Sequence, residues 1–260
     1  MAMTRALSIN GKILGNGKEP LICMPLVGRN EQAVLNELAA VLTKAPDLIE
    51  WRVDFFAGIE DMARTVLLAQ AIRANSSGVP IIFTRRSIRE GGEHIGMTED
   101  KVLQLYQAVC RAGTVDFIDY ELSSAPADFA SARTLAKETG VQLIASFHHF
   151  EMTPSREEIM AKFVAMEAAG ADIAKVAVMP QNIKDVLVLL EATLAAQNNI
   201  NLPLITISMG AYGAISRLFG WVFGSSVSFV VGQSASAPGQ VPIEDLRAVL
   251  EVVQRAMRAG

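Results

Sequence analysis

The sequence predicts an α/β fold, a (β/α)8 TIM barrel with an N-terminal β-hairpin. Eight short apolar runs alternate with eight amphipathic segments, and each pair takes up roughly 30 residues, the size of a strand–helix unit. Several runs are apolar on both faces of the strand, which is typical of parallel strands that are covered on both sides. The turn after the first run, Val27–Asn30, has no G-x-G-x-x-G motif, so the alternative of an open, doubly wound sheet is less favoured.

The elements can be predicted in chain order. Residues Ala6–Asn16 form a hairpin around an Asn10-Gly11 turn. The predicted strands are Leu21–Leu26, Leu48–Val53, Pro80–Thr84, Phe117–Glu121, Val141–His148, Ile173–Val178, Leu204–Met209 and Val227–Val231. The predicted helices are Glu31–Lys44, Asp61–Ala74, Thr98–Ala112, Asp128–Thr139, Arg156–Ala169, Ile183–Gln197, Ala214–Val222 and Ile243–Met257.

Composition excludes several classes of function. The chain is 260 residues long, 51% hydrophobic and carries a net charge of −4, so we expect a single domain over residues 1–260 and no nucleic-acid partner. The two cysteines are typical of buried thiols in a reducing compartment. We see no secretory signal, and the most apolar late stretch, 219–232, is too short to span a membrane. A cytoplasmic protein is expected.

One strand carries a residue that is unusual there. Lys175 interrupts the apolar run Ile173–Val178. A buried lysine tends to lose its proton, because a charge in a dry site costs several kcal/mol, and a neutral amine is a nucleophile towards carbonyl groups. The alternatives are a side chain that reaches solvent at the strand end or pairs with a structural carboxylate.

Alternation along the strands predicts which side chains share the barrel interior with Lys175. Apolar residues such as Ile49, Trp51 and Val53 should face the helices, so the residues between them point inward. Applied to five strands, this rule turns ten polar side chains inward: Glu50, Arg52, Asp54, Thr84, Arg86, Asp119, Glu121, Ser146, His148 and Lys175. Most lie near the carboxyl ends of their strands, where barrel enzymes hold their active sites.

An inward lysine beside an inward histidine, with no metal or cofactor motif, fits Schiff-base chemistry. His148 is the expected acid/base, because His149 lies on the opposite face of the strand or in the loop. We expect His94 to be a solvated loop residue. Nearby arginines should favour the free amine of Lys175 by repulsion, and they also indicate an anionic or polyhydroxylated substrate.

Six motifs then resemble the type I 3-dehydroquinate dehydratases of the shikimate pathway, in order and with similar spacing from about Pro20 onward. They are Glu50-Trp-Arg-Val-Asp, Phe83-Thr-Arg-Arg-Ser-Ile-Arg-Glu-Gly-Gly92, Ser146-Phe-His148, Lys175-Val-Ala-Val-Met-Pro180, Ile215-Ser-Arg217 and Ala235-Ser-Ala-Pro-Gly-Gln240. The resemblance implies syn elimination of water from 3-dehydroquinate through an imine, giving 3-dehydroshikimate. It also implies a homodimer that needs no cofactor or metal.

The resemblance assigns roles to individual residues. It makes Lys175 the imine-forming residue and His148 the proton carrier, oriented by Glu90. Arg217 would pair with the substrate carboxylate. The other implied residues are Glu50, Arg52 and Arg86 at ring hydroxyls, Met209 against the ring, Ser236 and Gln240 in a closing loop, and Asp119 near the lysine.

Three positions depart from the family pattern: Pro25, Arg85 and His149. They affect the expected substrate contacts and pH optimum, and His149 is a second candidate for the acid/base. Two other functions are also compatible with the residues. One is a class I aldolase for a phosphorylated sugar, and the other is a non-catalytic barrel that binds a ligand.

Overall fold

A computed structural model describes residues 6–9, 11–15 and 19–258. Eight parallel strands form one sheet in the order β10-β3-β4-β5-β6-β7-β8-β9. The strands are β3 (Leu21–Leu26), β4 (Leu48–Arg52), β5 (Ile81–Thr84), β6 (Phe117–Glu121), β7 (Gln142–His149), β8 (Ile173–Val178), β9 (Leu204–Ser208) and β10 (Val227–Phe229). Between β9 and β10 the sheet is joined by a bridge from Leu204 to Ser225, so the barrel is nearly closed.

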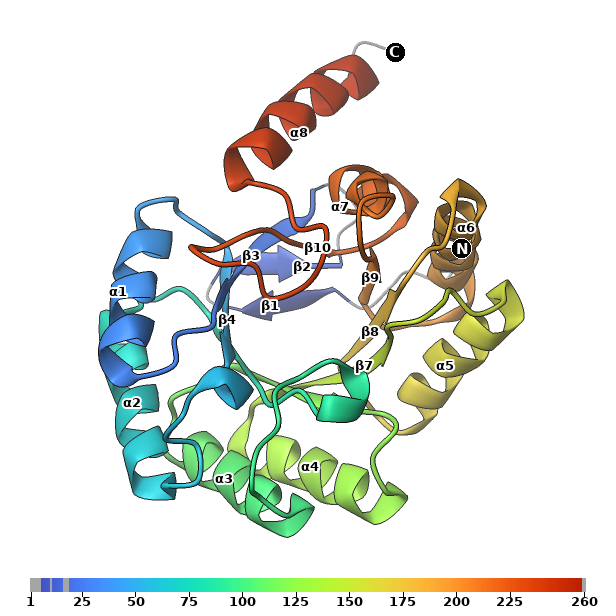
Figure 1. Ribbon diagram of the computed structural model, residues 1–260. Helices are drawn as coiled ribbons and strands as arrows, with labels where there is room; N and C mark the ends of the chain where they lie inside the picture. Colours follow the sequence, from blue (N-terminus) through green and yellow to red (C-terminus); the bar gives the residue numbers. More distant parts are fainter. Residues whose placement is uncertain (1–5, 10, 16–18, 259–260) are drawn as a thin grey trace.

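Helices surround the strands, as Figure 1 shows. They are α1 (Glu31–Leu42), α2 (Met62–Asn75), α3 (Glu99–Arg111), α4 (Pro126–Thr139), α5 (Arg156–Ala168), α6 (Ile183–Asn199), α7 (Ala214–Phe219) and α8 (Ile243–Arg258). Three short 3-10 helices join them: η1 (Val53–Phe55), η2 (Ile88–Glu90) and η3 (Gly220–Phe223). The predicted barrel is confirmed, and element ends differ from the prediction by one to a few residues.

Local chemistry explains where the helices begin. Asn30, Asp61 and Asn182 each accept a hydrogen bond from a backbone N–H of the first turn that follows them. Ser155 and Glu158 form a reciprocal capping box at the start of α5. The predicted helix around 214–222 is shorter than expected, because after Phe219 the chain tightens into η3.

The hairpin is also confirmed by the pairing of β1 (Leu7–Ile9) with β2 (Lys12–Leu14), although Asn10 of its predicted turn lies outside the described residues. Leu7 and Leu14 join the cluster of side chains that fills the barrel interior. Each of the eight strands contributes one residue to this cluster near its start: Cys23, Leu48, Ile82, Phe117, Ile144, Ile173, Ile205 and Val227. The hairpin therefore covers one end of the barrel, and the apolar layer separates it from the polar layer further along the strands.

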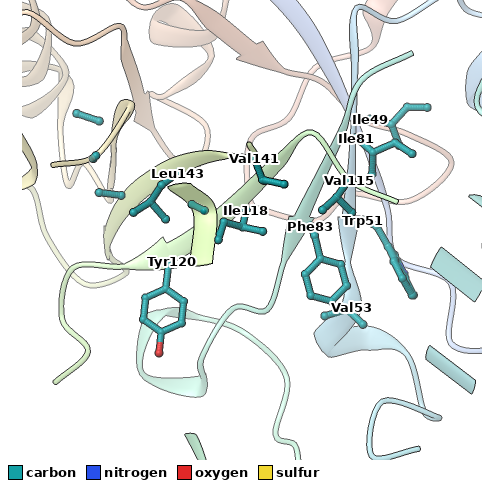
Figure 2. Packing of buried hydrophobic residues seen from close by; sticks show 14 of the residues in the cluster. Ile49, Trp51, Val53, Ile81, Phe83, Val115, Ile118, Tyr120, Val141 and Leu143 are labelled. Atoms are coloured by element: carbon teal, nitrogen blue, oxygen red, sulfur yellow. The ribbon is translucent and has the colours of Figure 1, made fainter. Parts of the chain in front are cut away.

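A second cluster fills the space between strands and helices. Figure 2 shows part of it, with Trp51, Phe83 and Tyr120 on the outer side of their strands. Trp51 and Phe83 meet edge to face with ring centroids 5.5 Å apart, and Phe83 meets Tyr106 at 5.1 Å. Because these residues face the helices, their neighbours Arg52, Thr84 and Glu121 must face the interior, which is the alternation predicted from the sequence.

Candidate active site

A pocket of about 460 Å³, mouth included, lies above the apolar layer at the carboxyl ends of the strands. It is lined by residues from six strands or the segments that follow them: Glu50, Arg52, Arg86, Glu90, Gly91, His148, Phe150, Lys175, Ala177, Ile207, Met209, Arg217, Phe229, Ser236, Ala237 and Gln240. Every residue that the sequence assigned to catalysis or substrate contact is among them. Asp119, which was placed behind the lysine, lies just beneath the pocket and is fully buried.

Lys175 points into the barrel and is only 4% exposed. Its Nζ donates to Asp119 Oδ2 at 2.8 Å and to Glu50 Oε1 at 3.4 Å, and it lies 4.6 Å from the centre of the Phe229 ring. We expected arginines to be the charges that influence this amine; the structure instead places two carboxylates against it. Asp119 and Glu50 lie 56 and 125 positions before Lys175 in the sequence, so the pattern of the strand could not predict these contacts.

His148 lies on the neighbouring strand. Ser146 is paired with Lys175 in the register of β7 and β8, and His148 follows two residues later on the same face. Its Nδ1 lies 2.9 Å from Glu90 Oε2, and its backbone N–H donates to the same oxygen at 3.0 Å. When Glu90 is ionised, its carboxylate can only accept hydrogen bonds, so Nδ1 carries the proton and Nε2 keeps its lone pair.

The surroundings of His148 keep the imidazole neutral. Burial lowers the pKa of His148 well below its usual value, and the positive charges of Arg86 and Lys175 lower it further, against the opposing effect of Asp119. A neutral imidazole with a free Nε2 can accept a proton at neutral pH.

Arg86 is held by several acceptors. It donates to Asp119 Oδ1 and Ser146 Oγ at 2.8 Å and to Glu121 Oε1 at 3.2 Å. Burial alone would lower the pKa of Arg86, but Asp119, Glu121, Glu90 and Glu50 together raise it. Arg52 is likewise paired, through a two-pronged contact with Asp54 at 2.9 and 2.8 Å. Both arginines line the pocket with most of their donors already in use.

Arg217 differs from these two. Its Nη1 and Nη2 donate to the carbonyl oxygens of Phe229 and Pro238, both at 3.0 Å, and its Nε has no partner among the described residues. No carboxylate of the described chain forms an ion pair with it, although it is only 4% exposed. Burial lowers the pKa of Arg217 to about 10. A buried cation without a counter-ion in a pocket is suited to bind an anionic group of a ligand.

The segment between β10 and α8, which Figure 1 shows leading from the barrel to the last helix, supplies the lining residues Ser236, Ala237 and Gln240. Arg52 donates to the Ser236 carbonyl at 3.2 Å, and Gly210 N–H donates to that of Pro238 at 3.2 Å. Within the segment, Ser236 and Gln240 hydrogen-bond to each other twice. Met209 lines the same pocket directly after β9.

The structure also places His94 and the three positions that depart from the family pattern, His149, Arg85 and Pro25. His149 faces away from the pocket, beside Phe147, and its Nδ1 accepts from the backbone N–H groups of residues 151 and 152 at 3.3 Å. Arg85 forms an ion pair with Glu99 on the helix side. Pro25 is buried in β3, paired with Glu50, and does not line the pocket. His94 is exposed and does not line it either.

Sequence reasoning missed several pocket residues. Phe229, Ile207 and Phe150 give the pocket apolar walls, and Ser123, which does not itself line the pocket, donates a hydrogen bond to Glu90. Alternation extended to the last two strands would have turned Phe229 and Ile207 inward, but Ser123 and Phe150 lie beyond the ends of their strands, where no periodicity applies.

Comparison with known proteins agrees with this geometry. Residues 22–257 match the family described as Type I 3-dehydroquinase. The chain belongs to that family. A 3-dehydroquinate dehydratase of Aromatoleum aromaticum is 66% identical over 99% of both chains. The crystal structure of the Geobacillus kaustophilus 3-dehydroquinate dehydratase is similar with a TM-score of 0.95 and 46% identity, covering 98% of this chain and 99% of that one.

A type I 3-dehydroquinate dehydratase structure from Clostridium difficile has a TM-score of 0.93 and 38% identity, covering 98% of this chain and all of that one. Family membership confirms the predicted fold and the predicted enzyme, a hydro-lyase that dehydrates 3-dehydroquinate to 3-dehydroshikimate in the shikimate pathway. The aldolase and the non-catalytic barrel are not supported. Among the helices of the described chain, none is both long and apolar enough to cross a membrane.

Proposed function

We propose that Lys175 forms the imine with 3-dehydroquinate and that His148 moves the protons of a syn elimination. The observation that carries this proposal is the shared pocket: the Lys175 amine, the Nε2 of His148 and the guanidinium of Arg217 all face one space, and no carboxylate of the described residues pairs with that guanidinium. Each of the three supplies something that the reaction requires.

The lysine supplies the electron sink. The ammonium gives up one proton, the free amine attacks the C3 carbonyl, and the carbonyl oxygen takes up two protons and leaves as water, so that a protonated imine remains. That iminium carries the same single positive charge as the ammonium, at the same place. Asp119 and Glu50, which already contact Nζ, are therefore positioned to stabilise it through the reaction.

The histidine supplies base and acid in turn. Nε2 of the neutral imidazole takes the C2 proton, and the electron pair moves into the conjugated enamine. The imidazolium then returns a proton to the C1 hydroxyl, which departs as water, on the same face because one residue serves both steps. Water then hydrolyses the product iminium, which releases the 3-dehydroshikimate ketone and restores Lys175 as the ammonium. Glu90 stabilises the transient charge on the ring through its contact with Nδ1.

Binding and closure use the rest of the pocket. Arg217 pairs with the substrate carboxylate, Glu50 and Arg52 contact ring hydroxyls, and Met209 packs against the ring. Arg86 holds its carboxylate partners in place and presents one edge to the ligand. The loop containing Ser236 and Gln240 closes over the substrate and excludes water. The scheme uses no cofactor or metal, and we also propose a cytoplasmic homodimer.

Paired substitutions of the adjacent histidines test the assignment. We expect His148→Ala to lose about 10²–10⁴-fold in kcat, the usual contribution of a general acid–base, while still forming the imine. His149→Ala should remain close to wild type, because that ring faces away from the pocket. The measurement is ultraviolet absorbance of the enone product formed from 3-dehydroquinate. Equal losses in both variants would contradict the assignment.

A further inference from the structure

We propose that Ser123 is a positioning residue for the acid–base pair, holding the Glu90 carboxylate so that His148 keeps its free nitrogen towards the substrate. This inference rests on the proposed role of His148. Ser123 lies just after β6, outside every motif on which the family resemblance depends. The inference is drawn from the contacts of Glu90, a buried residue at the end of η2.

The two oxygens of Glu90 have separate partners. Oε2 accepts from the Nδ1 and backbone N–H of His148, at 2.9 and 3.0 Å. Oε1 accepts from Ser123 Oγ at 2.5 Å. The serine hydroxyl therefore fixes the rotation of the carboxylate, because it holds the oxygen that His148 does not use.

The loop that carries Ser123 is tied to the strand that carries His148. Leu122 N–H donates to the carbonyl of Ser146 at 2.8 Å, which continues the pairing of β6 with β7 by one residue. Ser124 N–H donates to the Glu121 carbonyl at 3.1 Å and closes a turn on the other side of Ser123. The hydroxyl is thus placed relative to His148 by backbone contacts.

Charge explains why Glu90 needs this contact. Burial raises the pKa of Glu90, and so do the neighbouring carboxylates of Glu121 and Asp119, while Arg86 and the hydrogen bond from Ser123 lower it; the net result is a pKa of about 7. His148 is the remaining ionisable group in contact with it.

Protonation of Glu90 would stop the reaction. A protonated Glu90 can donate to Nδ1 of His148, and the ring would then carry its proton on Nε2, where the base must be free. By favouring the carboxylate, Ser123 extends the working range of His148 to lower pH.

Substitution at this position is informative because Ser123 is largely exposed, so Ser123→Ala leaves no buried cavity. We expect the acidic limb of the kcat/KM profile to move to higher pH, giving activity about three- to tenfold below wild type near pH 6 and close to wild type near pH 9. Ser123→Thr, which keeps the hydroxyl, should restore the wild-type limb. Ser124→Ala is the matched control, since its side chain makes no hydrogen bond within the described chain and its profile should not move.

Two results would overturn the proposal. One is a pH profile of kcat/KM for Ser123→Ala that coincides with the wild-type profile. The other is an equal loss at every pH accompanied by a higher KM, which would indicate a merely structural role. Borohydride trapping of wild type with 3-dehydroquinate separates this question from the proposed function: a Lys175 adduct supports the mechanism whatever Ser123 does, and its absence during turnover contradicts the mechanism itself.

Discussion

Two buried arginines of the same pocket, Arg86 and Arg217, have opposite surroundings. Arg86 is 3% exposed and lies among Asp119, Glu121 and Glu90, at 2.8, 3.2 and 3.7 Å. Arg217 is 4% exposed, and among the described residues its guanidinium donates hydrogen bonds only to backbone carbonyl oxygens. The pKa of Arg86 is raised by its carboxylates, whereas burial lowers that of Arg217.

The difference indicates that Arg86 maintains the structure of the pocket, whereas Arg217 binds the ligand. Charges that neutralise one another within the protein maintain the geometry of the pocket, while a charge left without a partner is available to a ligand. An anionic substrate would complete the contacts of Arg217, and it could add little to those of Arg86. The comparison predicts that substitutions at the two sites affect different quantities.

The largest expected effect is on stability, from Arg86→Met. Removing this guanidinium leaves buried carboxylates without their cation, which typically costs about 3–5 kcal/mol in the free energy of unfolding. Urea denaturation monitored by circular dichroism measures it. The control is Arg89→Met, at an exposed position of η2 three residues after Arg86. Its free energy of unfolding should stay within about 0.5 kcal/mol of wild type. A loss no larger than that of the control would contradict the scaffold role.

Arg217→Met should act on substrate binding instead. We expect kcat/KM to fall about 30- to 1,000-fold, mainly through KM, because a buried charge pair with a ligand is typically worth about 2–4 kcal/mol. Stability should fall much less than in Arg86→Met, since no carboxylate is left unpaired. Arg217→Lys keeps the positive charge but loses the two-pronged guanidinium, so its KM should lie between those of wild type and Arg217→Met. An unchanged KM in Arg217→Met would show that the substrate carboxylate binds elsewhere.

The smallest effect concerns alkaline pH. Arg217 has a folded-state pKa of about 10, below its unfolded value, so its charge costs stability below pH 10 and that cost declines as pH rises further. The raised pKa of Arg86 has the opposite sign, and its stabilisation is complete below the unfolded value. Because Arg217 loses its charge above pH 10, KM should rise by up to about tenfold per pH unit there. In Arg217→Met this rise should be absent; its persistence there would assign it to another group.

The sequence was sufficient to predict the arrangement of the barrel, because strict alternation on buried strands assigns each side chain to one face. Alternation alone therefore turns Glu50, His148 and Lys175 inward, and the structure places all three in the pocket. The same rule separated His148 from His149, which face opposite sides.

Contacts across the barrel could not be predicted in this way. The pairing of Lys175 with Asp119, like that of Arg86 with Glu121, joins side chains from different strands at distances that depend on barrel closure. Loop residues such as Ser123 have no periodicity from which their direction could be read. Likewise, only the folded structure shows that Arg217 has no acidic partner within residues 6–9, 11–15 and 19–258.

Borohydride reduction in the presence of 3-dehydroquinate, followed by peptide mass mapping, tests the central claim most directly. The account predicts one stable adduct on Lys175, in wild type and in His148→Ala, and none in Lys175→Ala. An adduct on another lysine, or normal turnover with no adduct at all, would contradict it.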